Sequence, residues 1–331
     1  MKTLIIAEAG VNHNGKLDIA LKLCDAAKEA GADVVKFQTW ITENIITRNV
    51  NKADYQIENT NNNDSQFEML KELELSQDDF RQIKKHCDEI GIQFASTADD
   101  KESLDFLVDL GIPFIKIGSG EIGNISYLRY MGVKGLPIIM STGMSTLEDI
   151  EISLNALRQG GAKDIMLLHC TTNYPCPFDS VNLNAMDTLR KEYGLPVGYS
   201  DHTKGIEVAI AAATKGACVI EKHFTLDKNM EGPDHLASTE PNEFKLMVDS
   251  IRNIEKALGD GNKVPTSSEL NISKVVLKRI VASKPIKKGE VINEDMITCK
   301  RNDSGEPAKK WDEVVGSIAN KDYSIDEGII L

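Results

Sequence analysis

The chain has 331 residues, of which 41% are hydrophobic and 27% are charged, a composition typical of soluble globular proteins. The formal net charge of −13 argues against nucleic acid or an anionic membrane as a partner, because the overall field repels polyanions. No apolar run approaches the ~18 residues that a membrane span needs. Glu8 interrupts the short first run, so we expect a first β-strand there rather than a signal peptide. Six scattered cysteines without a CxxC pair suit a reducing compartment, so we expect a cytoplasmic protein.

The order of the predicted elements indicates a barrel. Nearly continuous apolar runs predict strands buried on both faces at 4–9, 33–38, 92–96, 113–118, 137–142, 164–171, 196–200 and 218–225. Helical periodicity lies between them at 17–31, 78–90, 101–110, 146–160, 204–216 and 241–258, with Ser145 or Thr146 as an N-cap. Eight alternations over about 260 residues predict a (β/α)8 TIM barrel. The alternative, a doubly wound open sheet, lacks its glycine fingerprint in AGVNHNG.

The sequence divides into two domains. We expect the barrel to span residues 1–262, a polar linker to span 263–274, and a small, mostly β domain to span 275–331. The polar insertion at 39–75 is expected to cap the barrel mouth as a loop or lid.

Polar residues mark the end of every predicted strand, where the active site of such a barrel lies. Glu8, His202 and His223 belong to three consecutive strands, and residues two apart share a face, as Glu221 and His223 do. Two imidazoles and a carboxylate that converge would bind a divalent ion such as Mn²⁺. The alternative is a pair of hydrogen-bonded histidines at the mouth.

Two lysines inside barrel strands predict an anion. A buried ammonium is costly without a partner, so Lys36 and Lys116 are expected to bind a phosphate and a carboxylate together with nearby hydroxyls. Those hydroxyls belong to Thr97, Ser119, Ser141 and Ser200. Two alternatives remain open: an ion pair with a barrel glutamate, or a Schiff-base lysine of a metal-independent aldolase.

Several motifs resemble the sialic acid synthase family, from Ile5 to the C-terminus. They are IAEAGVNHNG, DVVKFQT, KIGSGE, PIIMSTGM, LLHCTTNYP, VGYSDHTKGIEVAIAAA, EKHFTLDKNMEGPDH and IKKGE…KR, the last resembling the antifreeze-like SAF domain. The resemblance implies a barrel followed by a SAF domain that is swapped onto the partner barrel of a homodimer. It also implies phosphoenolpyruvate and an N-acetylated amino-sugar as substrates.

The resemblance assigns roles residue by residue. It implies that His202 and His223 bind a divalent metal, expected to be Mn²⁺ with Mg²⁺ or Co²⁺ as alternatives. We expect Glu8, Glu221 and Glu121 to serve catalysis. The residues that resemble phosphoenolpyruvate contacts are Lys36, Thr97, Lys116, Ser119, Ser141 and Ser200. Those that resemble sugar contacts are Gln38, Tyr174, Asp234 and, from the partner's SAF domain, Arg301.

The expected reaction joins phosphoenolpyruvate, N-acetylmannosamine and water to give N-acetylneuraminate and phosphate. The alternative acceptor is a 2,4-diacetamido-2,4,6-trideoxy hexose, giving N,N'-diacetyllegionaminate or pseudaminate, and a non-catalytic sugar-binding protein is a third interpretation. Three segments depart from the family pattern and bear on the acceptor: STADD replaces STPF after Ser96, KRNDSGE replaces K-R-P-G-x-G at Arg301, and Thr172 replaces an asparagine.

Overall fold

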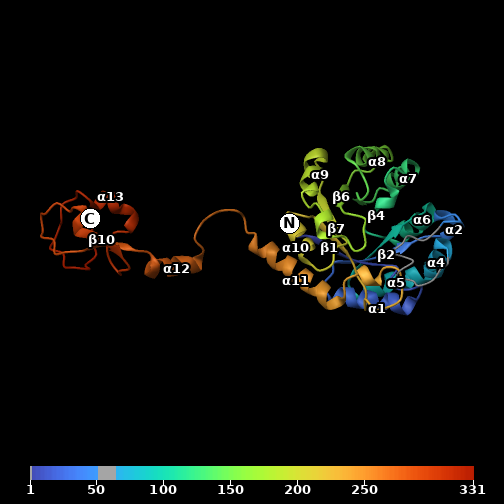
Figure 1. Cartoon of the computed structure of the whole chain (residues 1–331), viewed down its shortest axis with the longest axis horizontal. Helices are drawn as coiled ribbons and strands as arrows, with labels where there is room; N and C mark the ends of the chain where they lie inside the picture. Colours follow the sequence, from blue (N-terminus) through green and yellow to red (C-terminus); the bar gives the residue numbers. More distant parts are fainter. Residues whose placement is uncertain (1, 51–64) are drawn as a thin grey trace. The chain divides into compact units, whose positions relative to one another are not determined.

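Eight parallel strands close into a barrel (Figure 1). The computed structural model describes residues 2–50 and 65–331. The strands run in sequence order, and β8 pairs with β1 to close the cylinder. They are β1 (Leu4–Gly10), β2 (Val34–Thr39), β3 (Gln93–Ala98), β4 (Ile115–Ile117), β5 (Ile138–Ser141), β6 (Ile165–His169), β7 (Val197–Asp201) and β8 (Val219–His223). The predicted TIM barrel and all eight predicted strands are therefore confirmed.

Helices surround the barrel because their apolar faces pack on the outward side chains of the strands. The six predicted helices are α1 (Leu17–Glu29), α5 (Gln77–Ile90), α6 (Lys101–Leu110), α8 (Leu147–Gln159), α10 (Glu207–Thr214) and α11 (Pro241–Ala257). Two nine-residue helices, α7 (Ile125–Val133) and α9 (Ala185–Tyr193), were not predicted, since each offers little more than two turns of periodicity. Thr146, one of the two predicted N-caps, caps α8 in a capping box with Asp149. No helix in the described part of the chain is long and apolar enough to span a membrane.

The lumen is built in layers, because inward side chains recur every second residue of a strand. An apolar layer fills its N-terminal half, formed by Ile6, Val34, Ala95, Phe114, Ile139, Leu168 and Val219. Two residues further along the same strands, the layer becomes polar: Ile6 is followed by Glu8, Val34 by Lys36, and Val219 by Glu221. The apolar layer thus forms a dry floor beneath a charged layer at the C-terminal ends of the strands.

The insertion after β2 contributes helices in its described part. These are α2 (Thr42–Ile45) and α4 (Gln66–Leu73), and residues 51–64 of the predicted lid lie outside the described residues. Ser65 caps α4 through a capping box with Glu68. Met69 and Leu73 pack on Val11 and Trp40 in a small separate core, which holds α4 beside the first βα-loop.

The C-terminal part forms a second compact unit, residues 260–331, whereas the first ends at Gly259. Its antiparallel pair, β9 (Arg279–Ala282) and β10 (Ile297–Lys300), packs with α13 (Trp311–Val314) around a core of its own. The predicted linker, 263–274, contains most of helix α12 (Ser267–Val276), which Thr266 caps. Leu270, Ile272, Val275, Val276 and Leu277 are exposed on and after this helix.

Candidate active site

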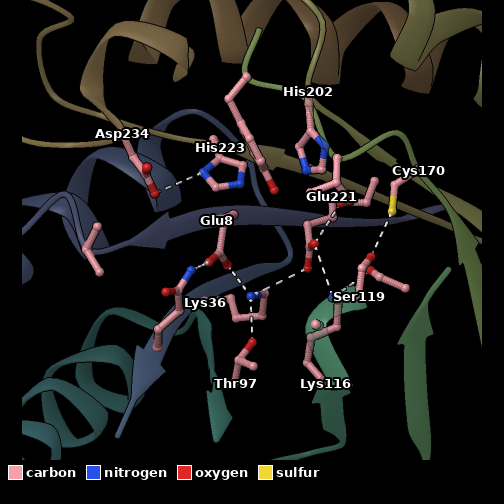
Figure 2. Close-up of a pocket in the computed structure, with 18 of the residues that line it drawn as sticks. Glu8, Lys36, Thr97, Lys116, Ser119, Cys170, His202, Glu221, His223 and Asp234 are labelled. Carbon is pink, nitrogen blue, oxygen red and sulfur yellow. Dashed lines mark hydrogen bonds and ion pairs between the residues drawn. The ribbon is translucent and has the colours of Figure 1, made fainter. Parts of the chain in front are cut away.

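A cavity of about 270 Å³ opens at the C-terminal ends of the strands. It is lined by every barrel residue that the sequence predicted for the site except Glu121: Glu8, Lys36, Gln38, Thr97, Lys116, Ser119, Ser141, Tyr174, Ser200, His202, Glu221, His223 and Asp234. Figure 2 labels ten of the lining residues and shows the imidazoles of His202 and His223 above the ammonium groups of Lys36 and Lys116.

Lys36 stands at the centre of a buried ion network (Figure 2). Its ammonium pairs with Glu8, lies 3.7 Å from an oxygen of Glu221, and donates a hydrogen bond to the Thr97 hydroxyl at 2.9 Å. Burial opposes its charge, but Glu221 and Glu8 together raise the pKa of Lys36. The ammonium is therefore charged at neutral pH and is partnered by carboxylates.

Lys116 forms the second half of the network, on the opposite side of Glu221. Its Nζ lies 3.4 Å from Glu221 Oε1 and donates to the Ser141 hydroxyl at 2.8 Å. Ser200 donates to the same carboxylate oxygen at 2.9 Å. The two lysines therefore pair with barrel glutamates, as one alternative predicted. Each also donates a hydrogen bond to a predicted anion-binding hydroxyl, Lys36 to Thr97 and Lys116 to Ser141.

The two glutamates of the network differ in acidity. Burial raises the pKa of Glu8 to about 7, since the attraction of one lysine does not offset desolvation. Burial would also raise the pKa of Glu221, but Lys116 and Lys36 outweigh it and lower that pKa to about 2. Glu221 is therefore a fixed anion, whereas Glu8 can gain or lose a proton near neutrality.

His202 and His223 lie side by side, with ring centroids 5.4 Å apart. The Nδ1 of His202 donates to the Thr171 carbonyl at 2.7 Å, which leaves the lone pair of Nε2 for another partner. Burial lowers the pKa of both imidazoles, and the neighbouring His202 lowers that of His223 further. Two adjacent neutral imidazoles, one with its tautomer fixed by a carbonyl, fit a divalent metal ion.

Glu8 does not join this pair. Its carboxylate turns to Lys36 and accepts a hydrogen bond from Gln38 at 3.0 Å, although its Cα is the register partner of His223. Among residues 2–50 and 65–331, no three His, Cys, Asp or Glu side chains are placed to share a metal. The predicted convergence of Glu8 with both histidines is therefore wrong, because the buried Lys36 ammonium attracts the Glu8 carboxylate more strongly than the neutral imidazoles do.

Two predicted residues lie apart from the cavity lining. Glu121 ends a short 3₁₀ segment, Ser119–Glu121, and accepts a hydrogen bond from Asn124 at 2.7 Å. Arg301 follows β10 and is exposed in the C-terminal unit. Glu121 therefore lies outside the lining of the cavity, and Arg301 belongs to the other compact unit.

The cavity also holds residues to which the sequence analysis gave no role. Val11, Met69, Leu70 and Leu73 give it one apolar side, three of them from α4. Asp99 and Thr172 line it as well, and the Thr172 hydroxyl is buried without a hydrogen-bond partner among the described residues. Both are positions at which the motifs depart from the family pattern, which was the signal that could have singled them out.

Comparison with known proteins identifies the family. Residues 23–263 match the family model described as NeuB family, which covers more than half of the chain. The chain belongs to the NeuB family. Residues 279–329 of this NeuB-family chain match the SAF domain, as the resemblance implied.

Two curated relatives match this NeuB-family chain over nearly its whole length. The N,N'-diacetyllegionaminic acid synthase of Campylobacter jejuni is 50% identical over 98% of both chains. That of Legionella pneumophila is 46% identical over 98% of this chain and 92% of its own. A solved N-acetylneuraminic acid synthetase from Leptospira borgpetersenii is 33% identical, with a TM-score of 0.71 over 83% of this chain and 93% of its own. The prediction of a synthase of this family is thereby confirmed.

Proposed function

We propose that the chain condenses phosphoenolpyruvate and water with a 2,4-diacetamido-2,4,6-trideoxy hexose, giving N,N'-diacetyllegionaminate and phosphate. The observation that carries the proposal is the cavity with two buried lysines below and two neutral histidines above. The relatives at 50% and 46% identity are named for this product, so they support the alternative acceptor over N-acetylmannosamine, the main expectation from the sequence.

The charged layer suits phosphoenolpyruvate. A ligand with a phosphate and a carboxylate can engage Lys36 and Lys116 at once, and the hydroxyls of Thr97, Ser141 and Ser200 already bond to members of this network. Ser119 accepts a hydrogen bond from the Gly143 amide at 2.9 Å, and its hydroxyl lies 3.3 Å from the Cys170 sulfur, a weak partner that an anion would replace. Such fixed, desolvated donors hold both charged ends of the substrate without reorganising during the reaction.

The upper part of the cavity suits a sugar with apolar substituents. Gln38, Tyr174 and Asp234 supply polar contacts near the mouth, whereas α4 supplies the apolar side. Acetyl methyls and the methyl at carbon 6 of a trideoxy sugar would bury apolar surface against that side, while a hydroxyl there would lose its hydration.

The chemistry follows from this placement. Carbon 3 of phosphoenolpyruvate attacks the aldehyde carbon of the open-chain sugar, water adds at carbon 2, and phosphate leaves with C–O cleavage. His202 and His223 would hold a divalent metal, Mn²⁺ in our proposal, which supplies Lewis-acid polarisation of the aldehyde oxygen. Glu8, whose pKa of about 7 lies near neutrality, is placed to take the proton of the incoming water. Glu221 remains anionic and positions the two lysines.

We further propose that two copies assemble with the SAF domain of one on the barrel of the other. The support is the set of exposed apolar residues on and after α12, which a lone chain leaves in water. In such a dimer Arg301 of one copy would reach the sugar in the other. Charge removal by Arg301→Ala should then raise the KM of the sugar and leave that of phosphoenolpyruvate nearly unchanged.

We place the protein in the cytoplasm. The support is that all six cysteines are unpaired, two of them, Cys24 and Cys87, with sulfur atoms 3.5 Å apart. Thiols so close would be expected to oxidise in a compartment that favours disulfides.

Phosphate release tests the proposed reaction. The full-length protein would be assayed with phosphoenolpyruvate, added Mn²⁺ and either the diacetamido sugar or N-acetylmannosamine. We expect kcat/KM to be highest with the diacetamido sugar, and His202→Ala or His223→Ala to abolish turnover and weaken Mn²⁺ binding in calorimetry. Full activity of either variant in metal-free buffer would refute the metal assignment, and no phosphate release with either sugar would refute the reaction.

A further inference from the structure

Asp99 lies at the mouth of the cavity. The chain has aspartate here in STADD, where the family motif STPF has phenylalanine. The side chain lines the cavity and is partly buried. Among the described residues, its carboxylate has no hydrogen-bond or ion-pair partner, although its oxygens still reach solvent.

The neighbouring residue shows that this is not a general feature of the loop. Asp100 caps helix α6, and its two carboxylate oxygens accept hydrogen bonds from the amides of Glu102, Ser103 and Ile41. It also accepts the Ser103 hydroxyl at 2.6 Å. Asp100 therefore stabilises this segment by capping α6 and bonding to Ile41, and Asp99 makes none of these contacts.

The position of Asp99 follows from the layers of the barrel. Its amide still pairs with the Thr39 carbonyl at 3.1 Å, so the strand geometry continues one residue beyond β3. Asp99 lies two residues after Thr97, which places it on the same inward face and roughly 6–7 Å nearer the mouth. The same step leads from Lys36 to Gln38 and from Glu221 to His223. Asp99 thus belongs to the mouth layer, above the groups that suit phosphoenolpyruvate.

A carboxylate in this layer can only accept hydrogen bonds while it is ionised. Burial and the nearby Glu121 raise the pKa of Asp99 to about 7, against the attraction of Lys36. Phosphoenolpyruvate is an anion and has no N–H or O–H to offer. The amino-sugar has both kinds of donor, and it enters at the mouth layer.

We propose that Asp99 is a specificity-determining residue that accepts a hydrogen bond from an N–H or O–H of the sugar. The inference rests on the proposed function, because it assumes that a sugar acceptor occupies the mouth layer. It predicts that this chain rejects an acceptor with an apolar group at that point, since the carboxylate would remain desolvated and unpaired. Relatives that carry the phenylalanine of STPF would not share this requirement.

The test compares Asp99→Ala and Asp99→Asn with the full-length wild type, using the diacetamido sugar and N-acetylmannosamine as probes. A lost hydrogen bond to a charged group should raise the KM of the preferred sugar roughly 10- to 100-fold in Asp99→Ala. Asp99→Asn should lose less, because its amide oxygen still accepts. The KM of phosphoenolpyruvate should change less than about twofold. Asp109→Asn, an exposed carboxylate on α6, removes the same charge and should match the wild type.

Thermal stability separates a binding role from a structural one. Removal of a desolvated carboxylate that has no partner should leave the melting temperature unchanged or higher, whereas loss of a structural group would lower it. The inference is overturned if the sugar KM of Asp99→Ala stays within about twofold of wild type, or if both KM values rise equally. No phosphate release by the wild type with either sugar would instead refute the proposed function itself.

Discussion

A buried ion pair behind the histidines should control the stability of the barrel. Lys222 lies between Glu221 and His223 on β8 and faces away from the lumen, where its Nζ contacts Asp201 Oδ2 at 2.6 Å. The two side chains are only 2% and 0% exposed. Lys222 also donates to the Thr203 carbonyl at 2.8 Å, and Asp201 accepts from the Thr203 amide and hydroxyl. The pair therefore joins the ends of the two strands that carry the histidines.

Lys222→Met leaves the Asp201 carboxylate buried without its cation, at a cost of about 3–5 kcal/mol. For a domain of this size each kcal/mol shifts the melting temperature by roughly 2–4 °C, so calorimetry should show the barrel transition lowered by on the order of 10 °C. The double variant Asp201→Asn with Lys222→Met also removes the unpaired carboxylate charge, so it should recover part of the lost melting temperature. Lys204→Met, an exposed lysine of the same loop, is the matched control.

The reasoning fails if Lys222→Met melts within about 2 °C of the wild type. It also fails if the double variant is no more stable than the single one, because the loss would then come from packing of the lysine stem rather than from an unpaired charge. Weaker Mn²⁺ binding by Lys222→Met would show that the pair also orients the two histidines.

Three further outcomes follow from the same contacts. The pKa of Glu8 is raised from 4.5 to about 7, so the folded state holds a proton that the unfolded state has lost between these pH values. The free energy of unfolding should therefore fall by up to about 3 kcal/mol as the pH rises from 4.5 to 7. Glu8→Gln should flatten this dependence in urea titrations at pH 5 and 7. Glu221→Gln removes a carboxylate that competes for both lysines, so calorimetry should show tighter binding of inorganic phosphate, and unchanged or weaker binding would contradict the network. Gly198→Ala places a Cβ 2.4 Å from the Val219 carbonyl and should destabilise the barrel by about 1–3 kcal/mol in denaturant titrations.

The fold and the polar residues at the strand ends could be predicted from the sequence, because both depend on local periodicity of two or 3.6 residues. Gln38, Tyr174 and Asp234, which also line the cavity, were predicted from the family resemblance instead. The orientation of Glu8 could not be predicted, since it depends on which lumen groups lie within reach of Lys36 once the barrel has closed. The apolar side from α4 also escaped prediction, because an insertion has no fixed place in the barrel repeat.

The pairing of both lysines with the chain's own glutamates has a consequence for selectivity. Each ammonium already pairs with a carboxylate of the same chain, and a tethered group competes at a high effective concentration. A small ion such as chloride or sulfate would have to displace a carboxylate for every contact it gains. A ligand with two anionic ends joined by a short rigid frame would displace the carboxylates from both lysines. It would lose its translational freedom only once, whereas two separate ions would each lose theirs. In the proposed function the site would therefore favour an anion with two charged ends over the abundant simple anions around it.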